Sequence, residues 1–268
     1  MALGLPVLVL LVLVAIGVEP RVPEVRRTAL GSGAVPFQIT QLSDLHLRAD
    51  DALNARIAAR ARSADGELVV LTGDVVDRAD RLGALDRFLA ALGGAVPVLA
   101  TTGNWEHWSH VDLAALADIY GRHDVQLLRD QRVRLAVGAN RRALDVVGLD
   151  DPGPRDAVPA TLLAGTDDVP LLVLAHHPAT AAAAALALAG RRDRPLVLAG
   201  HTHGGQVAIF GWAPTLPPGS AIDGQRAVDG AYPRPAADIW VSRGVGTSIL
   251  DVRWGVPATV EALAWAPG

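Results

Sequence analysis

The chain has 268 residues, half of them hydrophobic, which is enough for one large α/β domain or two small ones. Its formal net charge of −4 gives no reason to expect a nucleic-acid partner. Every basic residue is arginine and cysteine is absent, which excludes a phosphate-loop lysine, a Schiff-base lysine, disulfides and thiolate ligands. Any bound metal must therefore be held by nitrogen and oxygen atoms.

The N-terminal segment from Ala2 to Val18 is apolar and carries no charge. As a helix it would be at the short end of what spans a bilayer, and it lacks the basic residues that precede the apolar core of a signal peptide. A buried core helix is the alternative, but a run with no polar face fits that role poorly. We therefore expect residues 1–19 to anchor the chain in a membrane. Arginines follow the run and none precedes it, so the positive-inside rule weakly favours a cytoplasmic domain.

Residues 20–34 are expected to form a linker and a first edge strand, followed by one domain over residues 35–268. This domain alternates apolar strand-like runs with helical segments, which implies a largely parallel β core. Strands are expected at residues 37–42, 68–72, 96–101, 132–137, 143–149, 171–175, 196–199, 239–241 and 258–264. Helices are expected at residues 51–63, 81–92, 111–120 and 179–189, and a long loop at residues 204–235.

Five of these strands are followed directly by ionisable or amide side chains. In open α/β sheets, the carboxyl ends of the strands form the edge where ligands bind. One such residue is usually a helix cap or a turn residue, but seven at one edge, all with nitrogen or oxygen ligand atoms, favour a site for divalent cations. These residues are Asp44, His46, Asp74, Asn104, His176, His201 and His203.

The pair His201 and His203 is the most informative of these motifs. Residues i and i+2 of an extended segment project to the same side, so both imidazoles can point at one spot. Neutral imidazole is the commonest protein ligand for transition metals. Taken alone, the pair is equally consistent with two polar residues in a loop.

The ordered motifs resemble those of the calcineurin-like metallophosphoesterase superfamily. The matching motifs are Asp44-x-His46, Gly73-Asp74-x-x-Asp77, Gly103-Asn104, His176-x-Pro178 and Gly200-His201-x-His203. Gly204-Gly205-Gln206 and the segment 242–248 resemble the bacterial membrane-associated branch in particular. The resemblance covers the chain from about residue 35 to its end. It implies a four-layer α/β/β/α sandwich of two mixed β-sheets flanked by helices.

The resemblance also implies a binuclear metal centre with Mn²⁺, Fe²⁺/Fe³⁺ or Zn²⁺ as its two ions. The first ion would be held by Asp44, His46, Asp74 and His203. The second would be held by Asp74, Asn104, His176 and His201, with Asp74 as the bridge. An anionic bridge is expected on physical grounds, because two cations about 3.5–4 Å apart repel each other. Asp77 and Glu106 are expected to support the ligands as hydrogen-bond acceptors, although Asp77 alone would also suit a helix N-cap.

The third motif departs from the family pattern, which continues with a histidine where this chain has Trp105. Tryptophan cannot act as a general acid, and such an acid is typically worth 10²–10⁴-fold in rate. His107 could replace it only if the chain stays extended past Trp105, because residues i and i+2 lie about 200° apart on a helix. We expect such an extended path, and hence a catalytic role for His107 beside Asp74.

The predicted function is a metal-dependent phosphohydrolase that cleaves a phosphodiester, a pyrophosphate or a phosphomonoester by a metal-activated hydroxide. A membrane anchor would bring the site near lipid headgroups, so lipid-linked esters are among the substrates considered. The alternative is a catalytically weak or inactive metal-binding module that docks a partner at the membrane. Trp105 favours this alternative and the complete ligand set disfavours it. A Ser-His-Asp hydrolase is disfavoured further, since no Gly-x-Ser-x-Gly motif is present.

Overall fold

The computed structural model describes residues 22–164 and 168–268. The expected membrane anchor at residues 1–19 therefore lies outside the described residues. Within the described residues, no helix is both long and apolar enough to cross a membrane.

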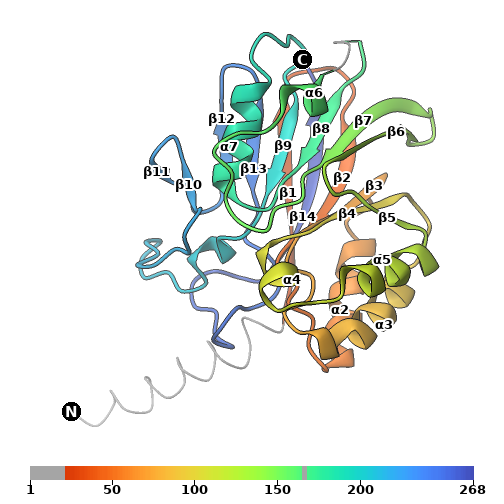
Figure 1. The fold of residues 1–268 in the computed structure, drawn as a ribbon, viewed down its shortest axis with the longest axis vertical. Coiled ribbons are helices and arrows are strands. Elements are labelled where there is room, and N and C mark those ends of the chain that lie inside the picture. The colour runs from red at the N-terminus through yellow and green to blue at the C-terminus, as the bar shows by residue number, and fades with distance from the viewer. Residues whose placement is uncertain (1–21, 165–167) are drawn as a thin grey trace.

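Two six-stranded sheets lie face to face at the centre of the molecule (Figure 1). The first contains, in spatial order, β1 (Glu24–Gly31), β14 (Thr259–Ala266), β2 (Phe37–Leu42), β3 (Leu68–Thr72), β4 (Val98–Thr101) and β5 (Val125–Leu127). The second contains β12 (Gly230–Pro233), β13 (Asp238–Val241), β9 (Leu196–Ala199), β8 (Leu171–Leu174), β7 (Arg142–Gly148) and β6 (Gln131–Val137). Both sheets are mixed, because the pairs β14–β2, β12–β13 and β6–β7 are antiparallel and the others are parallel.

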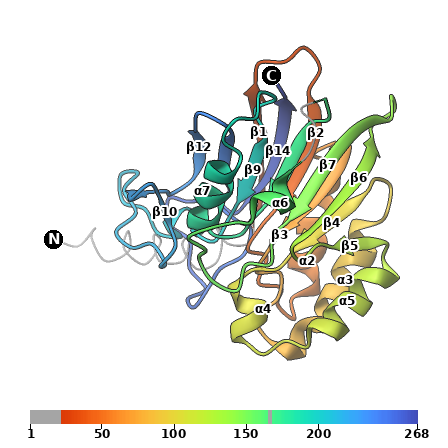
Figure 2. The same cartoon turned by 45° about the horizontal axis from the view of Figure 1, so that its top comes forward.

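Helices cover the outer face of each sheet, as Figure 2 shows from a second direction. The first sheet is covered by α2 (Asp51–Arg62), α3 (Leu82–Leu92) and α5 (Leu113–Arg122), and the second by α6 (Ala160–Leu163) and α7 (Pro178–Ala187). The remaining elements are short: η2 (Ala79–Arg81), α4 (Asn104–Trp108), η3 (His203–Gly205), β10 (Ala221–Ile222) and β11 (Gln225–Arg226). This arrangement confirms the predicted four-layer α/β/β/α sandwich.

The central strands are apolar on both faces because each sheet is covered on both faces. Along β3, Leu68 and Val70 pack between the two sheets, whereas Val69 and Leu71 pack against the outer helices. The strand β9 divides its side chains between the inner and outer layers in the same way. Two-sided burial explains why these strands read as continuous apolar runs rather than as alternating patterns.

Most elements fall close to the predicted ranges, and the differences lie in short segments. The helix α2 begins where expected, since the Asp50 side chain accepts a hydrogen bond from the Leu53 N–H at 3.0 Å. The predicted loop 204–235 contains most of η3, the β10–β11 hairpin and all of β12. The structure also adds β5 and α4, neither of which was expected. The segment expected to hold the first edge strand forms β1, which pairs with β14 over eight residues.

Candidate metal centre

Six buried side chains gather into two groups at the carboxyl ends of β2, β3, β8 and β9. In each group, one ligand atom of every residue lies within 4.8 Å of the others. The first group is Asp44, His46 and His203, and the second is Asp74, His176 and His201. The topology thus joins loops that are more than 150 residues apart in the chain, such as those carrying His46 and His203.

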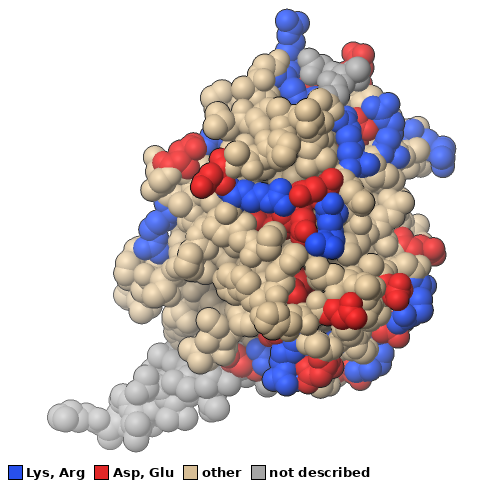
Figure 3. All heavy atoms as spheres, viewed as in Figure 1, with Lys and Arg blue, Asp and Glu red and all other residues tan. Residues whose placement is uncertain are grey.

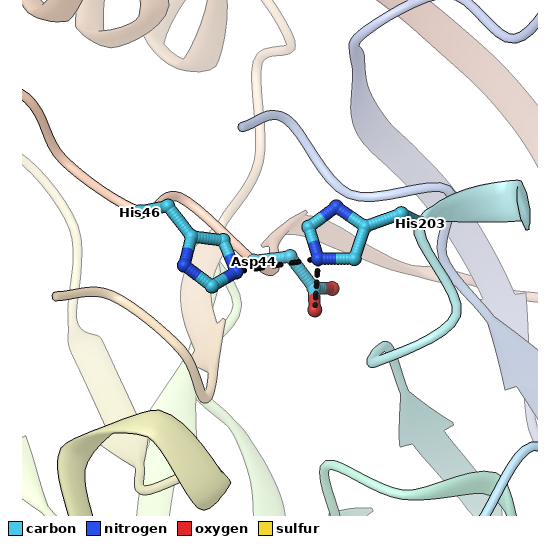
Figure 4. Close-up of side chains that lie close together, drawn as sticks. All are labelled: Asp44, His46 and His203. Carbon is cyan, nitrogen blue, oxygen red and sulfur yellow. Dashed lines mark hydrogen bonds and ion pairs between the residues drawn. The ribbon is translucent and has the colours of Figure 1, made fainter. Parts of the chain in front are cut away.

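In the first group, the imidazoles of His46 and His203 face each other above the carboxylate of Asp44 (Figure 4). The two Nε2 atoms lie 3.2 Å apart, and His203 Nε2 lies 3.5 Å from Asp44 Oδ1. Burial is the main cause that lowers the pKa of His203, so its ring is neutral and offers a lone pair. Two ring nitrogens and a carboxylate oxygen directed at one point suit a single transition-metal ion.

In the second group, backbone carbonyls fix the tautomers of both histidines. Nδ1 of His176 lies 2.9 Å from the Thr72 carbonyl oxygen, and Nε2 of His201 lies 2.7 Å from that of Pro218. Because a carbonyl oxygen can only accept, each of these nitrogens must carry the proton. The opposite nitrogens, His176 Nε2 and His201 Nδ1, lie 3.3 Å apart, and a cation bound there would displace the proton that His176 Nε2 otherwise shares with Asp74.

Asp74 lies between the two groups. Its Oδ1 accepts a hydrogen bond from the Trp105 N–H at 2.9 Å. Its Oδ2 lies 3.0 Å from His176 Nε2 and 3.8 Å from His46 Nε2. Burial would raise the pKa of Asp74, but the charge and hydrogen bond of His176 bring it well below its ordinary value. Asp74 is therefore an anionic side chain with one oxygen directed at both groups.

Asn104 adds an amide to the same centre. It is buried, and within the described chain neither its Oδ1 nor its Nδ2 has a hydrogen-bond partner. A buried amide without partners is costly in a folded protein. Its oxygen suits a divalent cation, so the orphaned amide fits a site that a metal completes.

Five of these residues have left-handed backbone conformations, which non-glycine residues seldom adopt. Their φ angles lie between 42° and 71°. Such strain persists only where the surrounding structure holds it in place, and it is typical of functional sites. The five residues are Asp44, His46, Asp74, His201 and His203.

Glycines allow the loops to approach one another this closely. Gly73 has a φ of 82°, and a Cβ atom there would lie 2.5 Å from His176 Nδ1. A Cβ atom on Gly103 would lie 2.4 Å from Asp74 Oδ1. Any larger residue at either position would therefore displace a candidate ligand.

The sequence matches the profile of the Metallophos family, described as calcineurin-like phosphoesterase, over residues 37–205. The chain belongs to this family. It is therefore a metal-dependent phosphohydrolase, and the resemblance found in its motifs is confirmed.

Other proteins are similar to this phosphoesterase over most of its length. It is 27% identical to YkuE of Bacillus subtilis strain 168, an uncharacterised metallophosphoesterase, over 88% of this chain and 83% of that protein. It is 28% identical to the phosphodiesterase YaeI of Escherichia coli K12, over 80% and 77% of the two chains. The crystal structure of TT1561 from Thermus thermophilus has the same fold, with a TM-score of 0.50 at 14% identity, over 79% of this chain and 91% of that one.

Two carboxylates of this phosphoesterase contact the candidate ligands or the loops that carry them. Glu106 is buried and accepts backbone N–H bonds from Asp74, Val75, Val76 and Gly103 at 2.6 to 3.2 Å. It therefore fastens the loop after β3 to the loop after β4. Asp77 Oδ2 lies 3.6 Å from His46 Nδ1, on the side of the ring away from His203.

The expectation that the chain stays extended past Trp105 is wrong, because α4 begins at Asn104. The Gly103 N–H donates to Glu106, which is the N3 half of a capping box and starts the helix. The helix turns His107 about 200° away from Trp105, and its Nε2 lies 2.8 Å from Asp150 Oδ1. His107 thus lacks the extended geometry on which its expected catalytic role depended.

Three residues that the sequence did not single out position the ligands. The Asp151 carboxylate accepts the backbone N–H bonds of His176 and His177 at 2.9 and 2.7 Å. The buried ring of His177 packs against that of His201, with their centroids 4.0 Å apart. Arg253 is fully buried, and its guanidinium donates to the carbonyls of Gly246 and Gly244 in the segment that packs on Asp44. Asp151 and His177 lie next to predicted motifs, whereas Arg253 lies in no pattern that sequence reasoning uses.

A cavity of about 370 Å³ opens over the metal centre. Trp105, Trp108 and Ile249 form apolar walls, and Thr202, Gln206, Thr215 and Ser248 supply neutral polar groups. Apart from the candidate metal ligands, no ionisable side chain of the described residues lines this cavity. The substrate space is therefore mainly apolar and contains no evident general acid.

Proposed function

We propose that this phosphoesterase uses two divalent cations to hydrolyse phosphodiester or pyrophosphate bonds whose leaving groups are acidic. The observation that carries the proposal is the position of Asp74 Oδ2, which faces both groups of ligands. The proposed ligands are Asp44, His46, Asp74, Asn104, His176, His201 and His203. The mixture of imidazole, carboxylate and amide favours Mn²⁺, Fe²⁺/Fe³⁺ or Zn²⁺ over Mg²⁺ or Ca²⁺.

The chemistry that two such cations supply is Lewis acidity toward a water molecule and toward phosphoryl oxygens. The residues of the chain hold the ligands in place. Carbonyls of Thr72 and Pro218 keep two ring nitrogens protonated and leave the opposite nitrogens facing the second group of candidate ligands. The Glu106 carboxylate fixes the backbone on both sides of Asp74 and Gly103.

The preference for acidic leaving groups follows from what lines the cavity. A leaving oxygen of low basicity departs without a proton, whereas an alkoxide needs a general acid. Trp105 lines the cavity and can supply only one N–H, and His107 is bonded to Asp150. Phosphomonoesters of simple alcohols should therefore be poor substrates.

We further propose that residues 1–19 anchor the chain in a membrane, with the catalytic domain on the cytoplasmic side. The apolar run and the arginines that follow it support this proposal. The domain would begin at β1 rather than at residue 35, since β1 is hydrogen-bonded to β14 along its full length. Fractionation of the full-length protein tests the anchor, and protease accessibility in intact cells tests the orientation.

The enzymatic proposal is tested with the full chain in detergent, loaded in turn with Mn²⁺, Fe²⁺ and Zn²⁺. The substrates are bis(p-nitrophenyl) phosphate, a dialkyl phosphate and an alkyl monophosphate. We expect metal-dependent turnover of the first and little of the others. Asp74→Asn should abolish this turnover, and Asp65→Asn, at an exposed carboxylate, should leave it unchanged. Metal binding without turnover of any substrate would favour the inactive, partner-docking alternative.

A further inference from the structure

Six large hydrophobic side chains, in segments that adjoin residues lining the cavity, are exposed to solvent. Their exposed fractions lie between 53% and 105%, and they make up six of the nine exposed large hydrophobic residues in the described chain. They come from α4, from a turn at residues 209–212 and from residues 249–250. We call this set the apolar rim: Trp108, Ile209, Phe210, Trp212, Ile249 and Leu250.

Hydrogen bonds fix residues 249–250 beside Gln206 and close the turn at residues 209–212. The Gln206 amide donates to the carbonyls of Ser248 and Leu250 at 3.3 and 3.0 Å and accepts from the Ser248 N–H at 2.8 Å. Ile209 and Trp212 exchange two backbone hydrogen bonds, of 2.9 and 3.0 Å. Gln206 lines the cavity together with the rim residues Trp108 and Ile249, whereas the other four rim residues are not part of the cavity lining.

Two residues of the apolar rim have backbone conformations that other residue types would adopt at lower cost. Phe210 has a φ of 51° and is followed by Gly211 at 78°, as in a type I′ turn, where asparagine is favoured at the first central position. Ile249 has a φ of 63°, which is an outlier for a β-branched residue. An exposed hydrophobic side chain in such a conformation stabilises neither the turn nor the core. These side chains are therefore suited to contact something outside the domain.

Charged groups contribute little to this surface. In the space-filling view, the surface over the loop region 204–219 at the lower left is nearly free of charged side chains (Figure 3). Arg48 and Asp251, near the rim residue Leu250, are neutralised locally: Arg48 Nη2 lies 3.6 Å from Asp251 Oδ1 and donates to Thr247 at 2.7 Å. An apolar partner fits this surface better than a charged one.

The described chain starts at the same edge of the molecule as the metal centre. The Glu24 N–H donates to the Ala258 carbonyl, and the next residue, Thr259, donates its N–H to Gly244. Gly244 lies directly against Asp44. Residues 19–23 connect this point to the apolar run Ala2–Val18, and five residues reach at most roughly 17 Å. A membrane that holds the apolar run would therefore lie close to the mouth of the cavity.

We propose that the apolar rim inserts into the surface of the bilayer and that the site takes phosphate esters whose hydrocarbon chain remains in that bilayer. This inference rests on the proposed phosphoesterase activity and on the N-terminal anchor. Trp108 and Ile249, which line the cavity and also belong to the rim, would contact the chain of such a substrate. Insertion would be driven by burial of apolar surface, so it should be insensitive to salt and should not require anionic lipid.

The absence of cysteine allows single labels to test the insertion directly. Full-length Phe210→Cys, Leu250→Cys and Leu186→Cys proteins are labelled with a fluorophore and placed in phosphatidylcholine vesicles containing a nitroxide lipid. Leu186 is exposed on α7, outside the rim, and serves as the control. We expect the nitroxide to quench the labels at 210 and 250 but not the label at 186, at low and high salt.

Equal access of an aqueous quencher to all three labels would overturn the proposal. If a second copy of the chain covers the rim instead, the labels at 210 and 250 will be shielded from the aqueous quencher in detergent solution. The shielding will increase with protein concentration, and the nitroxide lipid will not quench the labels. That outcome would also overturn it.

Activity separates this inference from the proposed function. Methyl and hexadecyl p-nitrophenyl phosphate share one leaving group, and only the second resides in vesicles. In a Phe210→Ser/Leu250→Ser protein, turnover of the methyl ester should stay within about twofold, while turnover of the hexadecyl ester should fall at least about tenfold. Leu186→Ser should change neither rate.

Failure of the unaltered protein to hydrolyse either ester with any metal would refute the proposed function. Normal turnover of both esters by the double variant would refute the membrane-inserting rim alone.

Discussion

The candidate metal ligands are held in place by residues that do not line the cavity. Glu106 shows this most clearly, since one carboxylate accepts hydrogen bonds from four backbone amides in two loops. Burial, and then the charge of Asp74, raise the pKa of Glu106 above its ordinary value. The four backbone donors are therefore needed to stabilise its buried carboxylate. The family motif names the ligands, and Glu106 sets the distance between the loops that carry them.

Glu106→Gln should therefore weaken both the fold and the metal centre. The new amide can accept with only one atom and turns its NH₂ group toward backbone donors. We expect a loss of about 1–3 kcal/mol in the free energy of unfolding and a loss of about 10–100-fold in metal affinity. Denaturant unfolding and metal titration measure the two effects. Glu24→Gln, at an exposed site, is the matched control, and equal behaviour of the two variants would contradict this role.

Trp105 lines the cavity at the position where the proposed function lacks a general acid. Trp105→His restores the residue type that the family motif carries and should raise turnover of a poor leaving group by about tenfold or more, leaving a good one nearly unchanged. Steady-state rates on alkyl and p-nitrophenyl diesters give the comparison. His107→Ala should not alter the ratio of these rates, because its ring faces Asp150. A change in that ratio would show that His107 takes part in catalysis.

At the scale of the elements, the strand β1 completes the first sheet. Arg26 on β1 donates to both carboxylate oxygens of the buried Glu261 on β14, at 2.8 and 2.6 Å. Burial raises the pKa of Glu261, and without Arg26 that carboxylate would lie unpaired in the core. The strand β1 therefore forms hydrogen bonds with β14, and its Arg26 neutralises the buried charge of Glu261.

A protein that starts at residue 35 should consequently be unstable, although the sequence places the domain boundary there. Loss of a partner for a buried charge alone costs about 3–5 kcal/mol, and the exposed edge of β14 would promote aggregation. A protein that starts at residue 22 should be soluble and should unfold cooperatively. Thermal unfolding and size-exclusion chromatography of the two proteins make the comparison, and equal stability would show that β1 is dispensable.

The sequence predicts the elements with two-sided burial well, because runs such as Leu68–Thr72 and Leu196–Ala199 are apolar throughout. It also predicts that the candidate metal ligands meet at one edge, because each follows such a strand. It does not predict α4, although Glu106, three residues after Gly103, is a helix-start signal. The aromatic and histidine residues of that segment are interpreted as an extended functional loop instead. Arg253 and the apolar rim could not be predicted, since their roles depend on contacts between segments far apart in the chain.

At the scale of the whole molecule, the metal centre links the two sheets. Asp44 and Asp74 follow strands of the first sheet, whereas His176, His201 and His203 follow strands of the second. Cations held between them would add bonds across an interface that the inter-sheet core and hydrogen bonds such as Gln41 Nε2–H to the Ala199 carbonyl already form. Metal binding should therefore stabilise the entire domain rather than one loop.

Removal and return of metal measure this link. At a concentration of metal 100-fold above its dissociation constant, binding contributes about 2.7 kcal/mol, which in a domain of this size raises the melting temperature by roughly 5–10 °C. The chelated full chain should melt lower, and Mn²⁺ or Zn²⁺ should restore the transition. His203→Ala should retain part of the increase. A melting temperature that no divalent metal changes would contradict the coupling.

Elemental analysis of the loaded full-length protein tests the central claim most directly, because the account depends on two cations sharing Asp74. Metal content per chain is measured for the unaltered protein, for Asp74→Ala and for His203→Ala after exchange into Mn²⁺, Fe²⁺ or Zn²⁺. We predict two ions in the first protein, almost none in Asp74→Ala and about one in His203→Ala. Absence of bound metal in the unaltered chain, together with no activation by any of the three ions, would contradict the account.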